Sequence, residues 1–245
     1  MKLLIKIPTR ERGFDWLHSY LDNITNPETR VLLTLDADQN TKELGSFLES
    51  LVLNNTLELM ENVDAVYNIS KGKIEAINRD INEYPYDWSI LMIGSDDMIP
   101  QVKGFDQRII DDMQKYYPDT DGCLWYKTED WEDEMRRRHR KQVSPGSAFF
   151  KNNWISMMPI MGKAYYERFN YVYHPSYKSF WCDNEFTKVA VGLNKITYIH
   201  EEIVRHMHPA WDSRGKDDKL YAINNENWKH DMSNFNSRRR KGFPI

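Results

Sequence analysis

The first hundred residues alternate short apolar runs with amphipathic segments, and this alternation is the feature that most constrains the fold. Runs suited to buried strands lie at 3–7, 30–36, 63–70 and 88–94. The first three are followed by segments with a helical spacing of apolar residues, at 12–24, 41–55 and 71–84. Strands rich in Val, Ile and Leu that alternate with such helices are typical of a parallel sheet covered on both faces. The sequence therefore predicts an α/β domain.

The second half of the chain is less regular. We expect helices at 104–117 and 182–193, and short strands at 121–127, 147–152, 195–199 and 202–209. We expect these strands to form a smaller, mixed sheet. The chain has no internal repeat and no Gly/Ser linker, which favours one domain over residues 1–210 and a polar, basic C-terminal extension over 211–245.

Charge and cysteine content exclude several classes of protein. The net charge of -4 argues against a protein that binds polyanions over its whole surface. Cys123 and Cys182 are the only cysteines, which fits a reducing compartment. The apolar patch at the amino terminus is short and interrupted by Lys6, unlike a secretion signal. No stretch approaches the roughly 20 apolar residues of a membrane helix. We therefore expect a cytoplasmic protein with no membrane partner.

Polar side chains follow all four predicted strands of the first half, at the point where each strand ends. They lie at 8–10, 36–38, 70–73 and 95–97. In open α/β sheets, ligands bind outside the carboxyl ends of the strands. The four segments therefore predict a binding site at that edge of the sheet.

The last of these segments holds two adjacent carboxylates, Asp96 and Asp97. Two like charges side by side repel each other unless a positive group lies near them. A divalent cation such as Mg2+ or Mn2+ prefers oxygen ligands and usually keeps substrate phosphates among them. The alternative is a helix N-cap, a position at which Asp is also favoured.

His206 and His208 stand two residues apart on a predicted strand, so their side chains point to the same face. Imidazole is a common ligand of transition metals. The alternative is an ordinary pair of buried, hydrogen-bonded histidines.

A predicted helix begins at Lys71, Gly72 and Lys73. A helix N-terminus flanked by lysines attracts phosphate through its free N–H groups and its dipole, although many solvated helices begin in the same way. Asn78 lies five residues after Lys73 and is placed to hydrogen-bond a base or a ribose.

Together these segments resemble the nucleotide-sugar-dependent glycosyltransferases of the GT-A fold, above all the large inverting family two. The segments that carry the resemblance, over residues 3 to 209, are KIPTRERG, LTLDAD, KGKIEAINRDI, ILMIGSDDMIP, CDNEF and RHMHP. Their order and spacing are more specific than any one motif. The resemblance implies a Rossmann-like, mostly parallel sheet sandwiched by helices. Residues 1–100 would form the nucleotide-sugar half and 101–210 the acceptor half.

The resemblance also implies roles for individual residues at the strand ends. The acidic DxD motif of the family corresponds to Ser95, Asp96 and Asp97, with Ser in the first position. Asp97 and His208 would bind the divalent metal, Mn2+ or Mg2+. The donor, most readily a UDP-sugar, would contact Pro8, Thr9, Arg10, Asp36, Asp38, Lys73, Asn78, Ser95 and Asp96.

The catalytic base of the family is the aspartate of an ED pair that opens a helix. Here this aspartate corresponds to Asp183, with Cys182 in place of the glutamate, and Glu185 is the second candidate. The implied reaction moves a sugar to an acceptor hydroxyl with inversion.

The acceptor is either a saccharide or a hydroxylated DNA base, as some viral enzymes of this kind modify DNA in the host cytoplasm. Residues expected on the acceptor side are Trp154, Gly162, Trp181, Arg136 and Arg137. The basic run 135–141 has an alternative interpretation, because the acidic run 129–134 before it would balance a solvated charge patch.

Two other functions fit parts of the sequence. A nucleotidyltransferase has a similar sheet and a metal-bound nucleotide, but the segment IPTRERG lacks the run of glycines that such enzymes carry after the first strand. A non-catalytic protein that binds sugars or nucleic acids is the other alternative.

Overall fold

The computed structural model describes residues 1–10, 14–36, 61–128, 155–207 and 225–244. Within these ranges, seven strands form one sheet in the order β3-β2-β1-β4-β7-β6-β8. The bounds are β1 Leu3–Thr9, β2 Arg30–Asp36, β3 Val63–Asn68, β4 Ile90–Ile93, β6 Cys123–Tyr126, β7 Ile160–Gly162 and β8 Ile196–Ile199. The first four strands of this order are parallel to one another, which confirms the mostly parallel sheet.

The second half of the chain extends this sheet. Strand β7 runs antiparallel to both β4 and β6, whereas β8 is parallel to β6. Two of the expected short strands, at 121–127 and 195–199, therefore join the main sheet as β6 and β8, whereas the one at 202–209 contributes to a small second sheet. The predicted strand at 147–152 and the predicted helix at 41–55 lie outside the described residues.

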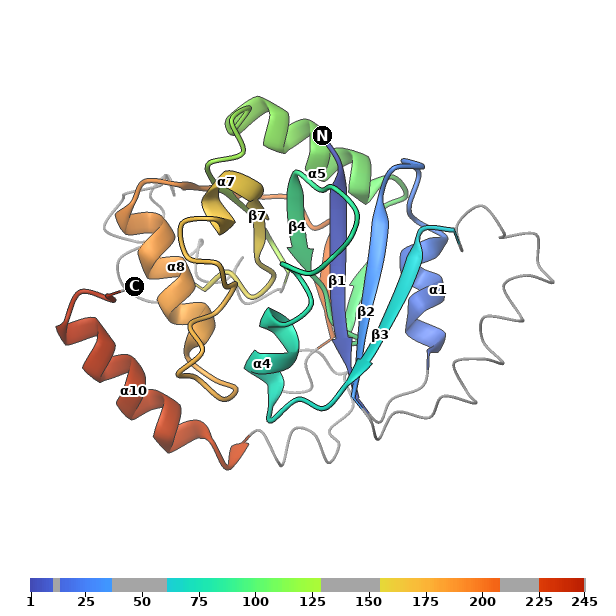
Figure 1. Cartoon of the computed structure of the whole chain (residues 1–245). Coiled ribbons are helices and arrows are strands. Elements are labelled where there is room, and N and C mark those ends of the chain that lie inside the picture. The colour runs from blue at the N-terminus through green and yellow to red at the C-terminus, as the bar shows by residue number, and fades with distance from the viewer. Residues whose placement is uncertain (11–13, 37–60, 129–154, 208–224, 245) are drawn as a thin grey trace.

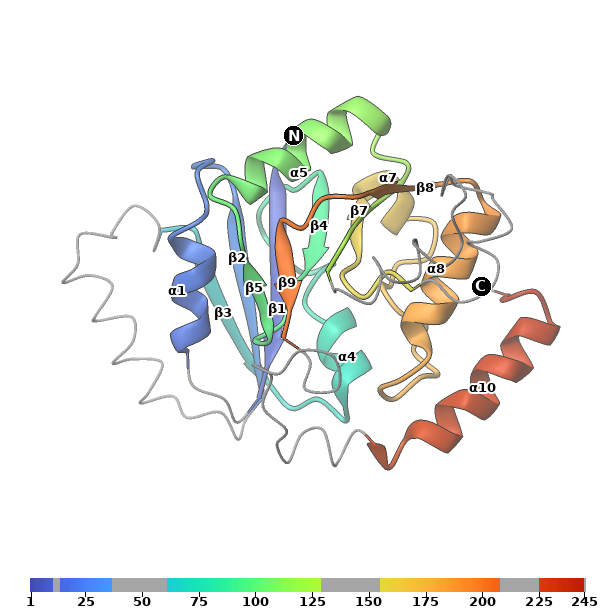
Figure 2. The same cartoon turned by 180° about the vertical axis from the view of Figure 1, so that it is seen from behind.

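Helices cover both faces of the sheet, as Figures 1 and 2 show. On one face lie α1 (Asp15–Leu21) and α5 (Phe105–Tyr116). On the other lie α4 (Lys73–Asn78), α7 (Lys163–Tyr166), α8 (Cys182–Gly192) and α10 (Trp228–Arg240). None of the helices in the described ranges is long and apolar enough to cross a membrane.

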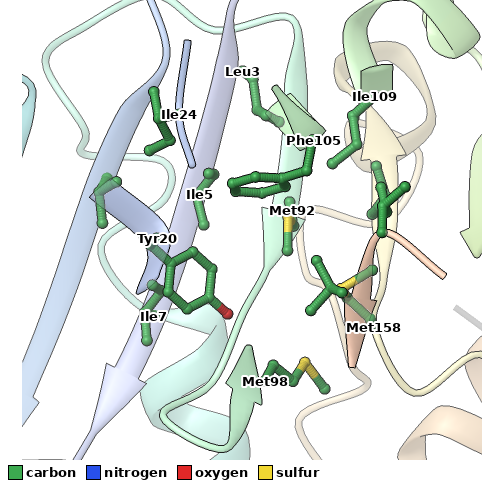
Figure 3. Packing of buried hydrophobic residues seen from close by; sticks show 14 of the residues in the cluster. Leu3, Ile5, Ile7, Tyr20, Ile24, Met92, Met98, Phe105, Ile109 and Met158 are labelled. Carbon is green, nitrogen blue, oxygen red and sulfur yellow. The ribbon is translucent and has the colours of Figure 1, made fainter. Parts of the chain in front are cut away.

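Two apolar cores result from the alternation of side chains along the strands. Leu3, Ile5 and Ile7 of β1 point into the core under α1 and α5, where Figure 3 shows them near the rings of Tyr20 and Phe105. The intervening Leu4 points to the core under α4 and α8. Both faces of β1 are therefore buried, which explains why apolar residues occupy positions 3–5 and 7 on both faces.

A second, two-stranded sheet lies at the carboxyl end of β4. It pairs β5 (Met98–Pro100) with β9 (Val204–His206) in antiparallel orientation. Met98 is the register partner of His206. This pairing brings the chain near residue 206 against the acidic turn that precedes β5. Because a strand and not a helix follows this turn, the interpretation of Asp96 or Asp97 as a helix N-cap is wrong.

Candidate active site

The carboxyl ends of β1 and β4 meet at the acidic turn. Lys6 of β1 is the register partner of Ile93, the last residue of β4. The carbonyl of Lys6 accepts a hydrogen bond from the Gly94 amide at 2.9 Å. Thr9, the last residue of β1, donates its hydroxyl to Asp96 at 3.1 Å. The predicted meeting of polar strand ends is therefore present for these two strands.

Gly94 allows the chain to turn here. A Cβ at this position would lie 2.7 Å from the hydroxyl oxygen of Tyr20 and 3.2 Å from the Ile7 side chain. The fully buried Tyr20 also donates its hydroxyl to the carbonyl of Ser95 at 3.3 Å. The turn that carries the two aspartates is thus packed closely on the core beneath it.

Asp97 and His206 face each other across the small sheet. The Nε2 atom of His206 lies 3.7 Å from Oδ1 of Asp97, which also accepts the hydroxyl of Ser95. The Met207 amide donates to the carbonyl of Asp97 at 2.7 Å. Sequence reasoning considered His206 but chose His208, which lies outside the described residues. The RHMHP motif did point to His206 as a candidate ligand, because the spacing of two residues predicts both histidines on one face of a strand.

Asp183 lies in the first turn of α8 and accepts the amide of Asn184 at 2.8 Å. Burial raises the pKa of the Asp183 carboxyl, and the positive charges of Lys73 and His206 act in the opposite direction. Lys73 is the first residue of α4, and its role beside the donor phosphates stays a prediction.

A polar network ties the end of β2 to α4. Asp36 is buried and accepts the amide of Ser70 at 2.9 Å. Arg79 donates to the hydroxyl of Ser70 at 2.8 Å and to the carbonyl of Leu35 at 3.0 Å. Sequence reasoning missed Arg79. The arginine follows Asn78 in the helix motif, but nothing in the sequence pattern indicates its partners.

Lys6 is a fully buried lysine in the middle of β1. Its Nζ atom donates to the Thr34 hydroxyl at 2.5 Å and to the carbonyl of Arg79 at 2.6 Å, and lies 3.8 Å from a carboxylate oxygen of Asp80. Burial lowers the pKa of Lys6 to about 7, although the charge of Asp80 opposes the shift. The lysine thus joins β1, β2 and the end of α4 beneath the strand ends.

Comparisons with known proteins were decisive only at the level of structure. A scan against models of protein families finds no match, and a search of curated proteins finds none either. A mannosyltransferase of Pyrobaculum calidifontis, PcManGT, solved with GDP-Man and Mn2+, matches with a TM-score of 0.57 and 14% identity over 83% of this chain and 55% of its own. Residues 1-349 of S. aureus TarS, solved with UDP-GlcNAc, match with a TM-score of 0.59 and 16% identity over 84% of this chain and 58% of theirs.

The third similar structure is glucosyl-3-phosphoglycerate synthase of Mycobacterium tuberculosis in complex with Mn2+, UDP and glucosyl-3-phosphoglycerate. It matches with a TM-score of 0.57 and 11% identity over 100% of this chain and 81% of its own. The chain has the GT-A glycosyltransferase fold. It spans little more than half the length of the chains of the first two similar structures. The resemblance in fold is thereby confirmed.

The residues at the end of β4 fit the divalent metal that is expected in a GT-A fold. Among the described residues, no three His, Cys, Asp or Glu side chains gather into a ready metal cluster. Asp97 and His206 nevertheless supply one carboxylate and one imidazole at 3.7 Å from each other. Ions such as Mn2+ bind through a few protein ligands and complete their shell with substrate phosphates and water. One carboxylate and one imidazole on the chain fit that chemistry.

Two predicted residues have structural tasks in this GT-A fold. Both ends of the Asn78 amide are engaged, because it donates to the carbonyl of Tyr173 at 2.6 Å and accepts the amides of Val172 and Tyr173 at 3.0 and 3.1 Å. Glu185 is buried, accepts the hydroxyl of Tyr177 at 2.7 Å and forms a bidentate ion pair with Arg238. Both oxygens of Glu185 are occupied by these partners, which leaves Asp183 as the better candidate for the base.

Two predicted acceptor-side residues pack closely against other parts of the chain. Gly162 pairs with Ile90 at the amino end of β4, at the opposite end of the strand from the acidic turn. A Cβ on Gly162 would lie 2.0 Å from the carbonyl oxygen of Thr120, so close packing is sufficient to explain this glycine. The acceptor-side role of Gly162 stays a prediction. Trp181 packs its ring against Trp228 and Phe235 of the C-terminal helix, with both centroid distances at 5.3 Å.

The remaining predicted residues divide into two groups. Pro8 is paired with Thr34 inside the sheet, and Arg10 follows the end of β1 and is partly exposed. The others, like His208, lie outside the described residues, namely Asp38, Arg136, Arg137 and Trp154.

Proposed function

We propose that the protein is a metal-dependent glycosyltransferase that moves a sugar from a nucleoside-diphosphate donor to an acceptor hydroxyl with inversion. The observation that carries this proposal is the contact of Asp97 with His206 beside the hydrogen bond from Thr9 to Asp96. A pair of metal-ligating side chains thus adjoins polar groups at the ligand-binding edge of the sheet.

Three similar structures support the choice of donor and metal. PcManGT was solved with GDP-Man and Mn2+, TarS with UDP-GlcNAc, and the phosphoglycerate synthase with Mn2+ and UDP. We therefore propose Mn2+ or Mg2+ as the metal and a UDP-sugar as the donor.

The proposed mechanism divides the work between two sides of the site. Thr9 and Asp96 hold the nucleoside end of the donor, and Lys73 contributes a positive charge near the phosphates. Asp97 and His206 hold the metal, which when bound stabilises the negative charge of the departing diphosphate.

On the acceptor side, Asp183 accepts the proton of the attacking hydroxyl. Its raised pKa makes this carboxylate a stronger base than an exposed aspartate. Attack opposite to the leaving group inverts the anomeric centre, so the reaction needs no second carboxylate as a nucleophile. A single well-placed base agrees with the engagement of Glu185 by Arg238.

A donor panel tests this proposal. Nucleotide sugars are incubated with the protein and Mn2+, and release of the nucleoside diphosphate is measured for the wild type, Asp97→Ala and Asp111→Ala. Asp111 is an exposed aspartate on α5 and serves as the control. We expect metal-dependent release that is lost only in Asp97→Ala. Release of pyrophosphate from a nucleoside triphosphate supplied together with a sugar 1-phosphate would indicate a nucleotidyltransferase instead, and no turnover in either assay would indicate a binding protein.

The acceptor is proposed to be a saccharide or a hydroxylated DNA base. The same assay, repeated with oligosaccharides and with hydroxymethylated DNA, separates the two. If DNA is the acceptor, neutralising Arg136 and Arg137 together should lower DNA-dependent turnover and leave release without acceptor unchanged. DNA-dependent turnover that survives this change would contradict a role of the basic run in binding DNA.

A further inference from the structure

Helix α10 lies along α8, the helix that begins with Cys182 and Asp183. Figures 1 and 2 show the two helices side by side in both views. The sequence predicted a polar, basic tail in this part of the chain. Three separate contacts of α10 converge on the first turn of α8 and on the loop before it.

The first contact is made by Asp231, which is fully buried. Its carboxylate accepts the main-chain amides of Lys178, Ser179 and Phe180 at 3.1, 2.8 and 2.9 Å. An ionised carboxylate that accepts several N–H groups forms stronger hydrogen bonds than a neutral acceptor. Asp231 therefore fixes the loop that leads into α8.

The second contact holds a strained residue. Trp181 precedes α8 and has a φ of 64°, a left-handed conformation that is unfavourable for a bulky side chain. Its ring packs against the rings of Trp228 and Phe235. Strained residues of this kind persist where surrounding contacts over-determine them, and they cluster at functional sites. Here the surrounding contacts come from α10, and Asp183 is two residues away.

The third contact is the ion pair between Arg238 and Glu185. The guanidinium donates to both carboxylate oxygens at 2.8 Å, and both side chains are largely buried. Bidentate pairs of this type fix orientation as well as distance. Glu185 and Asp183 share the first turn of α8, so Arg238 limits the rotation and sliding of that turn.

The same loop adjoins the donor side of the site. The carbonyl oxygen of Lys178 lies 3.6 Å from the position that a Cβ on Gly72 would take, next to Lys73 at the start of α4. The loop held by Asp231 therefore lies between the segment proposed to face the donor phosphates and the helix that carries the proposed base.

We propose that α10 is a positioning element for catalysis, in which Asp231 and Arg238 hold Asp183 at the correct distance from the donor. This inference rests on the proposed function. Neither residue is expected to touch the substrate. Small displacements of a catalytic group cost large factors in rate while substrate binding is retained.

The test uses the full chain with Asp231→Asn and, as a milder change, Arg238→Lys. Asn at position 231 keeps one of the two side-chain oxygens that accept the loop amides. Lys at position 238 keeps the positive charge but cannot form the bidentate pair with Glu185. Asp106→Asn is the matched control for the first variant, because Asp106 is also fully buried and accepts main-chain amides, of Thr25 and Asn26, on the opposite face of the sheet. Arg239→Lys, an exposed neighbour on α10, is the control for the second.

Two quantities are measured: steady-state release of the nucleoside diphosphate, and hydrogen exchange of the Ser179 and Phe180 amides. We expect kcat to fall between about tenfold and about a hundredfold in Asp231→Asn, with a smaller fall in Arg238→Lys, while the donor KM changes less than about twofold. The two amides should exchange faster in Asp231→Asn. Both controls should keep the kcat of the wild type.

An unchanged kcat together with faster exchange of these amides would overturn the inference, as would an equal fall of kcat in Asp106→Asn. Failure of the proposed function itself gives a different result. In that case the wild type releases no nucleoside diphosphate from any donor. The catalytic role of α10 is then also excluded, even if the two amides exchange faster in Asp231→Asn.

Discussion

Among single residues, Asp183 has the most direct proposed role in catalysis. Burial raises the pKa of its carboxyl, and the hydrogen bond from the Asn184 amide and the charges of Lys73 and His206 offset this only in part. Glu185, two residues later, has the same chemistry but is occupied by Arg238 and Tyr177. The partners of the two carboxylates therefore distinguish Asp183 from Glu185, and the sequence pattern does not reveal these partners.

Asp183→Asn should remove the proton acceptor and keep the shape of the side chain. We expect kcat to fall by a factor between about a hundred and about ten thousand with little change in donor affinity. Steady-state release of the nucleoside diphosphate measures this fall.

The raised pKa of Asp183 predicts a pH dependence in the wild type. Because the base acts in its deprotonated form, the acid limb of the rate profile should lie at a higher pH than that of an ordinary aspartate. The pH dependence of kcat/KM measures this, and an acid limb at the ordinary pKa of aspartate would contradict it.

Lys6 gives a prediction about stability. Its pKa is lowered from 10.5 to about 7 in the folded protein. Between these two values the unfolded chain binds more protons than the folded chain, so the stability contributed by this group rises with pH. Relative to Lys6→Met, the wild type should gain about 2 kcal/mol in the free energy of unfolding between pH 7 and pH 9. Urea denaturation at the two pH values measures the gain, and parallel pH dependences of the two proteins would refute the lowered pKa.

At the scale of elements, the strand ends were predictable and the tertiary partners were not. The alternation of apolar runs places 8–10 and 95–97 at one edge of the sheet, and the structure joins Thr9 to Asp96 there. The parallel topology places both strand ends at one edge, and the adjacency of β1 and β4 in the sheet brings them into contact. The partners of Asn78 and Trp181 come from 172–173 and from α10, which are distant in sequence. Local patterns carry no signal for such contacts.

The C-terminal helix illustrates the same limit. Only Asp231 and Phe235 are fully buried along α10, so its sequence is polar on most sides and lacks a clear apolar stripe. A buried carboxylate cannot be recognised as a core position from its residue type, because Asp is almost never buried without partners. The region was therefore predicted as a tail, whereas it packs on α8.

Gly162 provides a test of close packing against an acceptor-side role at the end of β7. In Gly162→Ala the new Cβ would meet the Thr120 carbonyl, whereas nothing lies within 4 Å of a Cβ on Gly192 at the end of α8. We expect Gly162→Ala to lower the free energy of unfolding by about 1–3 kcal/mol and Gly192→Ala to leave it unchanged or higher. Thermal or urea unfolding measures both. A stable Gly162→Ala that loses acceptor affinity would support the acceptor-side role instead.

At the scale of the whole molecule, one sheet edge collects groups from distant parts of the chain. The end of β1, the turn after β4, the start of α8 and β9 all contribute to it. The two-stranded sheet is essential to this arrangement, because it brings His206 to Asp97 across more than a hundred residues of sequence. The fold class was predictable from periodicity. The choice between His206 and His208 was not, since the sequence pattern predicts both on the same face of a strand.

In the proposed function, this edge of the sheet binds a nucleoside diphosphate through a divalent ion held by Asp97 and His206. Calorimetric titration of UDP into the wild type, His206→Ala and the α5 control Asp111→Ala, each with and without Mn2+, measures this binding. We expect Mn2+ to tighten UDP binding at least about tenfold in the wild type and in Asp111→Ala, and His206→Ala to lose most of this gain. UDP binding that is equally tight without Mn2+, or a gain that persists in full in His206→Ala, would rule out this role of the two residues.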